Sequence, residues 1–376
     1  MILTIISFIV ILTLLVFVHE LGHFVAAKKA GLRVHEFGFG FPPRIFGIKK
    51  GDTLYSINAL PLGGFVKIEG EDGTHEKDPK SFASRPAWVR AIILVAGVVM
   101  NLIFAAFLFA VAYGIGLPQA LPDEAIPRAN VRDAAIVISA VDAGSPAEKA
   151  GVAAGDKLKY FNGKEITTVS ELQGIIAENR GKNTSIIVVK DGRDTTLSIT
   201  PRAEDVEGQG PLGIELSKTG FVSYPWYWAI WYGAKTSVTS FGLIAVSIYQ
   251  LIHDAFVVGH VNGDAFTGPV GIAVLTGEFA HQGILYLVWF AAFLSVNLAF
   301  VNIIPFPALD GGRLLFVIIE KIRGGKKVKP ETENIAHLAG FGILLLLVIV
   351  ITFKDVHRYW EGFVHLWERI VHFFAH

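Results

Sequence analysis

The sequence predicts an α-helical integral membrane protein with about four transmembrane helices, a small membrane-associated β-sheet and an inserted extracytoplasmic α+β domain. Of its 376 residues, 52% are hydrophobic, a share that soluble proteins of this length rarely reach. Apolar runs long enough to cross about 30 Å of hydrocarbon begin at Met1 and recur along the chain. Between the second and third runs, residues 118–218 have the mixed charge of a soluble domain.

These runs divide the chain into consecutive segments. We expect two spans with an intervening hairpin region, a soluble domain, an interfacial amphipathic segment, two further spans and a C-terminal interfacial helix. The expected bounds are 1–117 (hairpin region 33–88), 118–218, 219–283, 284–355 and 356–376.

The composition excludes two kinds of chemistry. The chain carries 33 basic and 33 acidic residues. Its charge is therefore balanced and does not indicate a basic surface that binds nucleic acid. Cysteine is absent, which excludes disulfides and thiolate ligands and leaves His, Asp and Glu to bind a metal.

The first span, about 2–27, ends in the motif His19-Glu20-Leu21-Gly22-His23. On a helix, His19 and His23 lie one turn apart on one face, so both imidazoles can reach one metal ion while Glu20 lies beside them. Zinc hydrolysis needs two such ligands, a water position and an unligated carboxylate as base. The motif could arise by chance, but ionisable groups inside an apolar helix are costly and indicate function.

Positive charge sets the expected orientation of the first span. Lys28, Lys29 and Arg33 follow it directly, which indicates a cytoplasmic face there and an external N-terminus. A cleaved signal peptide is the alternative, but it would need a positive start and would discard the histidine motif.

The region 33–88 reads as short strands and turns rather than as a span. Polar and apolar residues alternate from Thr53 to Asn58. A glycine break at Gly63 and Gly64 follows, directly before Phe65. A sheet edge between Thr53 and Ile68 could hold an extended substrate by strand addition. The alternative is a hairpin that only covers the site.

The second span, about 91–117, carries Gly97 and Asn101 four residues apart. A small residue and an amide on one face allow another helix to pack closely. Asn101 could serve the active site or bond a neighbouring helix.

The segment 118–218 contains β-rich runs such as Lys157–Phe161 and helix signals such as Ser145–Glu148. The stretch from Ser145 to Gly151, followed by Gly155-Asp156 and Asn162-Gly163, resembles a PDZ domain. The resemblance places a peptide-binding loop near the end of the segment, where main-chain N–H groups could receive a terminal carboxylate, at Leu212, Gly213 and Ile214. Alternatively, the domain binds nothing and acts as an obstacle above the membrane site.

Residues Tyr224 to Val258 are aromatic and apolar and could form either a span or a helix in the membrane interface. If they crossed, the next span would carry its polar motif to the opposite face from His19. We therefore expect this segment to lie on the outer surface.

The third span, about 284–304, ends in a broken polar motif that runs from Asn302 to Gly312 and includes Pro305 and Pro307. A broken helix at membrane depth is tolerated where its backbone lines a cavity. Asp310 lies as far from the start of its span as His19 does from Met1, so we expect it to be the third ligand. Glu36 is the competitor.

Together, the histidine motif, Gly97 and Asn101, the PDZ segment and the motif around Asp310 resemble the bacterial site-2 proteases, intramembrane zinc metalloproteases of the regulator-of-sigma-E type. The resemblance implies one zinc per chain, a cytoplasmic (inner) membrane location, and an active site toward the cytoplasm. It implies single-span membrane protein substrates such as anti-sigma factors or remnant signal peptides, cut after an upstream site-1 protease. The implied roles are zinc ligands His19, His23 and Asp310, base Glu20, and substrate-positioning residues Asn302, Pro305 and Pro307. The alternative is a membrane-bound PDZ adaptor without catalysis; a transporter fits less well.

Overall fold

The structure is a computed structural model that describes residues 2–73, 75–122, 126–190, 192–204, 210–258 and 267–358. The chain forms two compact units. The first contains Met1–Ala110 and Ile230–His376, and the second contains Val111–Ala229.

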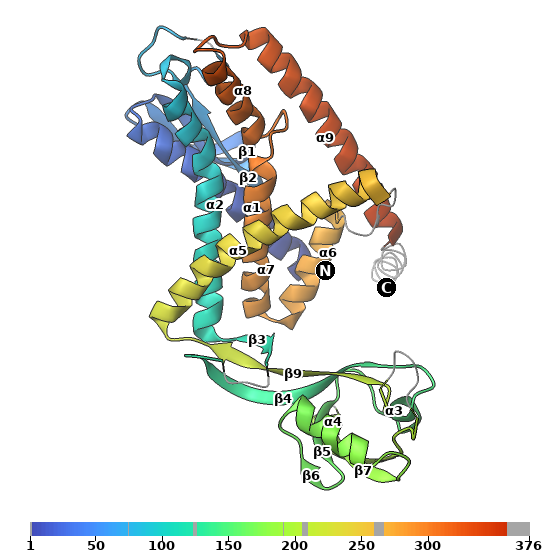
Figure 1. Ribbon diagram of the computed structural model, residues 1–376. Coiled ribbons are helices and arrows are strands. Elements are labelled where there is room, and N and C mark those ends of the chain that lie inside the picture. Colours follow the sequence, from blue (N-terminus) through green and yellow to red (C-terminus); the bar gives the residue numbers. More distant parts are fainter. Residues whose placement is uncertain are drawn as a thin grey trace, which may run out of the picture. The chain divides into compact units, whose positions relative to one another are not determined.

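Long helices dominate the first unit (Figure 1). In chain order they are α1 (Ile2–Lys29), α2 (Ala87–Ile115), α5 (Trp226–His253), α6 (Pro269–Gln282), α7 (Ile284–Ile303), α8 (Asp310–Ile322) and α9 (Pro330–Arg358), with short turns η1 (Phe82–Ser84) and η2 (Asp254–Val258). Within the described residues, five helices are long and apolar enough to cross a membrane: Ile2–Lys29, Ala87–Ile115, Trp226–Val257, Ile284–Ile303 and Pro330–Arg358. The third of these, which includes α5, is the least apolar, so the expected number of about four spans stays a prediction.

Helix α1 turns one face toward the protein interior. Its buried residues recur about every fourth position, at Ser7, Ile11, Leu15, His19 and His23. Ile11 and Leu15 pack against Ala291 of α7, in one hydrophobic cluster. The two motif histidines continue this inward face, so the same pattern that packs α1 aims both imidazoles inside.

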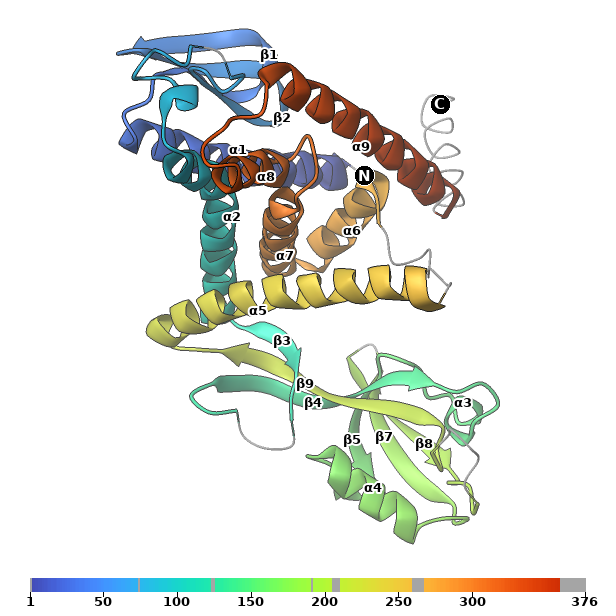
Figure 2. The same cartoon turned by 45° about the horizontal axis from the view of Figure 1, so that its top comes forward.

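Helix α5 passes across α2 and then α7 in both views (Figures 1 and 2). The Ser237 hydroxyl donates to the Leu102 carbonyl of α2 at 2.9 Å. One turn later, Phe241 meets Phe300 of α7 with ring centroids 5.4 Å apart. Contact with two successive helices along one short stretch shows that α5 crosses them rather than running beside either one.

Helix α6 was not anticipated from the sequence, which indicated only a bend at Gly268 and Pro269. Pro269 instead begins a 14-residue helix, where its missing N–H costs nothing. The N–H of Gly271 donates to the carboxylate of Asp355 in α9 at 2.8 Å, and Asp355 is 3% exposed. The expected interfacial segment 219–283 therefore ends in a helix that is bonded to α9, and the interfacial position of this segment stays a prediction.

Strands β1 (Val34–Lys50) and β2 (Thr53–Ile68) form the small sheet of the first unit. Each strand bends back on itself, so the two strands contribute four hydrogen-bonded rows to the sheet. The pairing gives the row order: Gly38 pairs with both Phe65 and Ser56, and Ser56 also pairs with Gly47. The row of Ser56 is therefore interior. The expected edge from Thr53 to Ile68 is wrong in its first part, and the part that remains an edge includes Phe65.

The second unit is an antiparallel sheet with short helices. The strands are β3 (Leu117–Ala120), β4 (Asn130–Val141), β5 (Lys157–Phe161), β6 (Lys164–Glu165), β7 (Thr184–Lys190), β8 (Arg193–Ile199) and β9 (Ile214–Ser223), in the order β3-β9-β4-β5-β7-β8 with β6 beside β5. Helices α3 (Pro146–Lys149) and α4 (Val169–Glu178) begin at Ser145 and Thr168, whose hydroxyls accept from the N–H three residues on. Buried aliphatic side chains and Phe161 form its core.

The expected peptide-binding loop of this unit, Leu212 to Ile214, makes contacts within the unit itself. Leu212 is 2% exposed and belongs to the core, and its carbonyl accepts from Ala147. The N–H of Gly213 already donates to the Gly210 carbonyl, and Ile214 pairs with Val141 in the sheet. The N–H of Gly213 is thus already engaged within the unit, and peptide binding at this loop stays a prediction.

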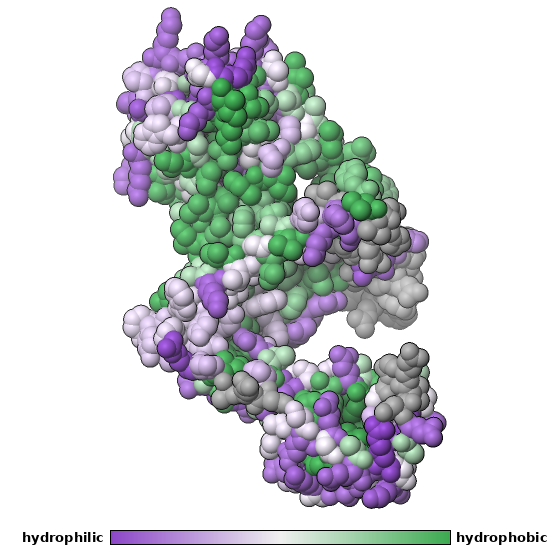
Figure 3. All heavy atoms as spheres, viewed as in Figure 1, coloured by the Kyte–Doolittle hydropathy of each residue, from purple (hydrophilic) through white to green (hydrophobic). Residues whose placement is uncertain are grey.

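Hydropathy in the first unit changes along its length (Figure 3). Hydrophobic residues gather over α2, and hydrophilic ones gather at the end where α8 is followed by α9. The expected C-terminal helix over 356–376 lies almost wholly outside the described residues.

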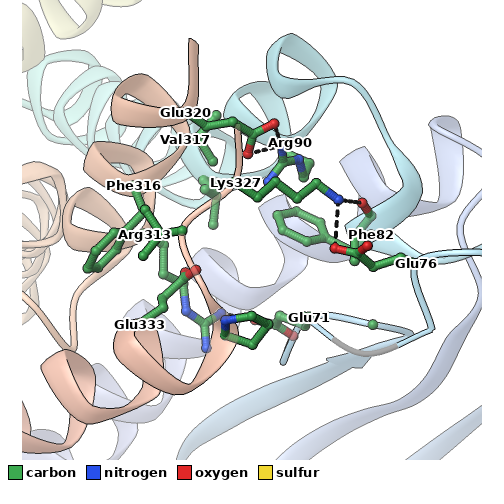
Figure 4. A pocket seen from close by; sticks show the side chains of 16 residues that line it. Glu71, Glu76, Phe82, Arg90, Arg313, Phe316, Val317, Glu320, Lys327 and Glu333 are labelled. Carbon is green, nitrogen blue, oxygen red and sulfur yellow. Dashed lines mark hydrogen bonds and ion pairs between the residues drawn. The ribbon is translucent and has the colours of Figure 1, made fainter. Parts of the chain in front are cut away.

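A buried ion pair fixes the distal end of α8 (Figure 4). Arg90 Nη2 lies 2.6 Å from both carboxylate oxygens of Glu320, and the two side chains are 10% and 11% exposed. Two charges out of water stabilise each other only as a pair, so loss of one leaves the other unmatched. This contact ties α8, which begins at Asp310, to the start of α2.

Glu320→Ala should therefore lower the free energy of unfolding by about 3–5 kcal/mol, because it leaves the buried Arg90 charge without a counter-charge. The measurement is the unfolding midpoint in SDS titrations of micellar protein. The matched control is Asp52→Ala, which removes the exposed pair with Lys80 and should change stability by at most about 1 kcal/mol. Equal effects of the two substitutions would contradict the role of burial.

Candidate metal centre

Three side chains from two distant parts of the chain, α1 and the start of α8, meet inside the first unit. His19 Nε2 lies 2.9 Å from Asp310 Oδ2, and His23 Nε2 lies 3.1 Å from the same oxygen. The two imidazole Nε2 atoms are 3.2 Å apart. Within the described residues, this is the one group of three or more side chains whose ligand atoms could hold a metal ion.

The spacing fits a tetrahedral ion. In a tetrahedral zinc site with bonds of about 2.0–2.1 Å, neighbouring ligand atoms lie about 3.3 Å apart. The three observed separations are close to that value. Two imidazoles and one carboxylate leave the fourth position open, as catalytic zinc sites require.

Main-chain contact fixes the orientation of one ring. His23 Nδ1 lies 2.8 Å from the Ile93 carbonyl of α2, so Nδ1 carries the hydrogen and Nε2 is left with its lone pair. A metal-binding histidine commonly donates its other N–H in this way, which sets the tautomer and the ring plane.

Asn101 of α2 lies next to His19 and also contacts α7 through its main chain. Its Nδ2 lies 3.4 Å from Nδ1 of His19, and its main-chain carbonyl accepts from Ser295 of α7 at 2.9 Å. Its Oδ1 is buried and has no partner among the described residues. Turning the amide over would let Oδ1 accept from Nδ1–H of His19, which is the arrangement that a metal-bound Nε2 needs.

Asp310 is held by the tight loop that joins α7 to α8. A methyl group added at Gly312 would lie 2.3 Å from the Phe306 carbonyl, so only glycine lets the loop fold back so closely. The Ala308 N–H donates to Nδ1 of His337 in α9 at 2.8 Å. One turn after Asp310, Arg313 forms an ion pair with Glu71. Helix α9 and the hairpin region thus both position the third candidate ligand.

The charge of Arg313 is secured by its neighbours. Burial lowers the pKa of this guanidinium, but the carboxylates of Glu71 and Asp310 outweigh burial and raise it. Arg313 therefore stays protonated beside the site.

The remaining predicted residues lie around this cluster. Asn302 Nδ2 is 3.5 Å from His19 Nε2, so the amide reaches the open side of the site. Glu20 is partly exposed. Within the described residues, it accepts no hydrogen bond and forms no ion pair. Pro305 and Pro307 belong to the loop before Asp310, and the Pro307 carbonyl packs on Gly340 of α9.

The sheet edge lies close to the same helix. Gly63 and Gly64 pack against Val16 and Phe17 of α1, less than one turn before His19, and Phe65 follows them in the edge row. Glu36, the competing ligand, pairs inside the sheet with Lys67 and Leu54 and is absent from the cluster.

Sequence reasoning missed His337 and Asp355, although a signal for both was present. Each is an ionisable residue near one end of the apolar run of α9, and such residues have functional or structural partners by default. Their partners, Ala308 and Gly271, offer only main-chain N–H groups, which no sequence motif reveals.

Helices that can cross a membrane and an inward-facing pair of histidines with a carboxylate define a membrane-embedded metallopeptidase. Comparison with known proteins agrees: residues 7–347 match the model of peptidase family M50. The chain belongs to this family.

Curated relatives match it along most of its length. Zinc metalloprotease RasP of Geobacillus kaustophilus is 31% identical over 95% of this chain and 98% of its own. The regulator of sigma-W protease RasP of Bacillus subtilis is 31% identical over 94% of this chain and 98% of its own. Among solved structures, the PDZ domain of an SdrC-like protein from Listeria innocua is 22% identical over 22% of this chain and 92% of its own, with a TM-score of 0.20.

These findings confirm the predicted class. The protein is a zinc metalloendopeptidase of the site-2 protease type and a multi-pass membrane protein.

The close packing of Gly97 against His19 and His23 allows the position of the metal site to be tested. A methyl group at Gly97 would lie 2.5 Å from His23 Nε2 and 2.7 Å from His19 Cε1. Gly97→Ala should therefore displace both rings and lower zinc content at least several-fold, measured by elemental analysis of purified protein. Gly114→Ala is the control in the same helix, because its nearest neighbour, Ala229, is 3.9 Å away. Full zinc occupancy in Gly97→Ala would show that the metal lies elsewhere.

Proposed function

We propose that His19, His23 and Asp310 bind one catalytic zinc ion per chain and that the enzyme cuts peptide bonds within or next to a transmembrane segment. The convergence of the three ligand atoms at 2.9–3.2 Å is the observation that carries this proposal. Zinc bound there supplies an activated water and polarises the scissile carbonyl.

The side chains around the ligands then have distinct tasks. Glu20 has no competing hydrogen bond within the described part of the chain, so it is free to take a proton from the attacking water and to return it to the leaving amine. Asn302, at 3.5 Å from His19, can donate to the substrate carbonyl as negative charge develops on its oxygen. Pro305 and Pro307 break the backbone so that the amide faces the site.

The substrates are single-span membrane proteins, including membrane-bound regulators of sigma factors and remnant signal peptides. The name of the Bacillus subtilis relative, a regulator of sigma-W protease, supports the first class. A site-1 protease would act first on the same substrate and remove its external domain.

The substrate is held as an added strand on the row Gly64–Ile68. A transmembrane helix hides its scissile bond within its own hydrogen bonds, so cleavage requires unwinding, and a sheet edge replaces the lost bonds. The position of Gly63 and Gly64 on α1, just before His19, supports this choice of edge.

The expected topology follows from the same arrangement. The enzyme lies in the bacterial cytoplasmic (inner) membrane, with the second unit outside and the active site toward the cytoplasm. Four helices cross, and α5 lies along the outer interface; its crossing of α2 and α7 supports this assignment (Figure 2).

The function is tested by separating metal binding from proton transfer. Asp310→Ala should lose zinc, whereas Glu20→Gln should keep about one zinc per chain and still lose cleavage by at least roughly a hundredfold, because the amide cannot take up the proton. Zinc is measured by elemental analysis, and cleavage is followed on a model single-span substrate in micelles. Undiminished turnover by Glu20→Gln would exclude Glu20 as the base, and full zinc in Asp310→Ala would exclude Asp310 as a ligand.

The proposed binding of substrate as an added strand is tested by proline substitutions at Phe65, Val66 and Lys67. Proline removes a main-chain donor, so cleavage should fall only at positions whose N–H points away from β1 and toward the substrate. Turnover is compared among variants with unchanged zinc content. Proline at Ile48 in the opposite edge row is the control and should leave turnover unchanged. If all folded variants in the Gly64–Ile68 row cleave like the parent, the hairpin only covers the site.

A further inference from the structure

A hollow of about 670 Å³ lies between α1 and α2, within the first unit. Its floor consists of small residues four apart in sequence: Gly22 and Ala26 of α1, and Ala30 directly after the end of α1. Its wall consists of large α2 side chains that are 57–66% exposed: Trp88, Ile92 and Ile103. From Trp88 to Ile103 the wall is about 22 Å long, which suits an extended hydrocarbon chain.

Two cations close one end of this groove. Lys29 is the last residue of α1, and Arg85 comes shortly before the start of α2, so both lie at the same end. In the part of the chain that the structure describes, neither forms an ion pair, and Arg85 Nε is buried without a hydrogen-bond partner. Arg90 and Arg313, by contrast, each contact a glutamate.

The arrangement has the chemical pattern of one ligand. An apolar channel with unmatched positive charge at its mouth complements a molecule with a long hydrocarbon chain and an anionic head. Trp88 stands at the charged end and is 66% exposed, as expected of an aromatic residue at the level of lipid head groups. A soluble anion would leave the apolar wall uncovered, and an uncharged lipid would leave the guanidinium unpaired.

We propose that this groove binds an anionic phospholipid, with one acyl chain along Gly22, Ala26 and Ala30 and the phosphate between Lys29 and Arg85. A forked guanidinium pairs well with phosphate oxygens, and Lys29 adds a second charge. The lipid would cover the outer side of the helical turn that carries His23. This site does not depend on the proposed catalytic roles.

The test counts lipids retained by the purified full-length chain. The protein is mixed in micelles with equal amounts of phosphatidylglycerol and phosphatidylcholine, and bound lipids are identified by native mass spectrometry. The parent should retain phosphatidylglycerol in preference to phosphatidylcholine. The double substitution Lys29→Gln, Arg85→Gln should reduce phosphatidylglycerol retention by about fivefold or more.

Two further variants separate this site from general attraction of anionic lipid. Lys49→Gln, Lys50→Gln removes two exposed cations of the hairpin and should leave retention unchanged. Ala26→Leu fills the groove floor and should reduce retention of phosphatidylglycerol while both cations remain. Zinc content equal to that of the parent shows that each variant is folded, and Lys29→Gln alone serves if the double variant is not.

The proposal fails if phosphatidylcholine is retained equally by the parent. It also fails if the hairpin variant loses as much phosphatidylglycerol as the groove variant, or if Ala26→Leu changes nothing. Loss of affinity for a single-span substrate peptide without loss of phosphatidylglycerol would assign the groove to substrate instead.

Discussion

Burial of charge among apolar helices is the constraint on which this structure depends. His19, His23 and Asp310 come from places nearly three hundred residues apart, and each would be costly alone in hydrocarbon. Placed within 3.2 Å of one another, they share one metal-sized position. The fold around them therefore has one main task, which is to hold two helices and a loop in register.

Several elements hold that register through main-chain contacts. The Ile93 carbonyl sets the His23 ring, and His337 holds the N–H of Ala308, two residues before Asp310. The Arg90–Glu320 pair then fixes the far end of α8. Each contact satisfies a polar group that lipid could not, so orientation of the ligands and stability of the fold come from the same bonds.

The sequence predicted the cluster because its members leave a strong local signal. Spacing placed His19 and His23 on one face, and equal depth along two spans selected Asp310 over Glu36. Contacts through the backbone carry no such signal, so the sequence around Gly268 and Pro269 predicts only a bend where α6, capped by Asp355, begins. The row order of the sheet was equally hidden, because a strand that folds back on itself reads like a continuous one; the interior position of Ser56 appears only in three dimensions.

The bond between Gly271 and Asp355 has a consequence for the order in which the chain can assemble. Helix α6 precedes α9 along the chain, so until α9 is synthesised the N–H of Gly271 lacks the carboxylate that accepts from it in the finished fold. Until α9 is made, α6 can still pack against α7, where Phe279 stacks on Phe290, but the hydrogen bond at its start is missing. A chain released before Asp355 would keep every metal-binding side chain and still lack the last helix that locks α6 and the Asp310 loop in position.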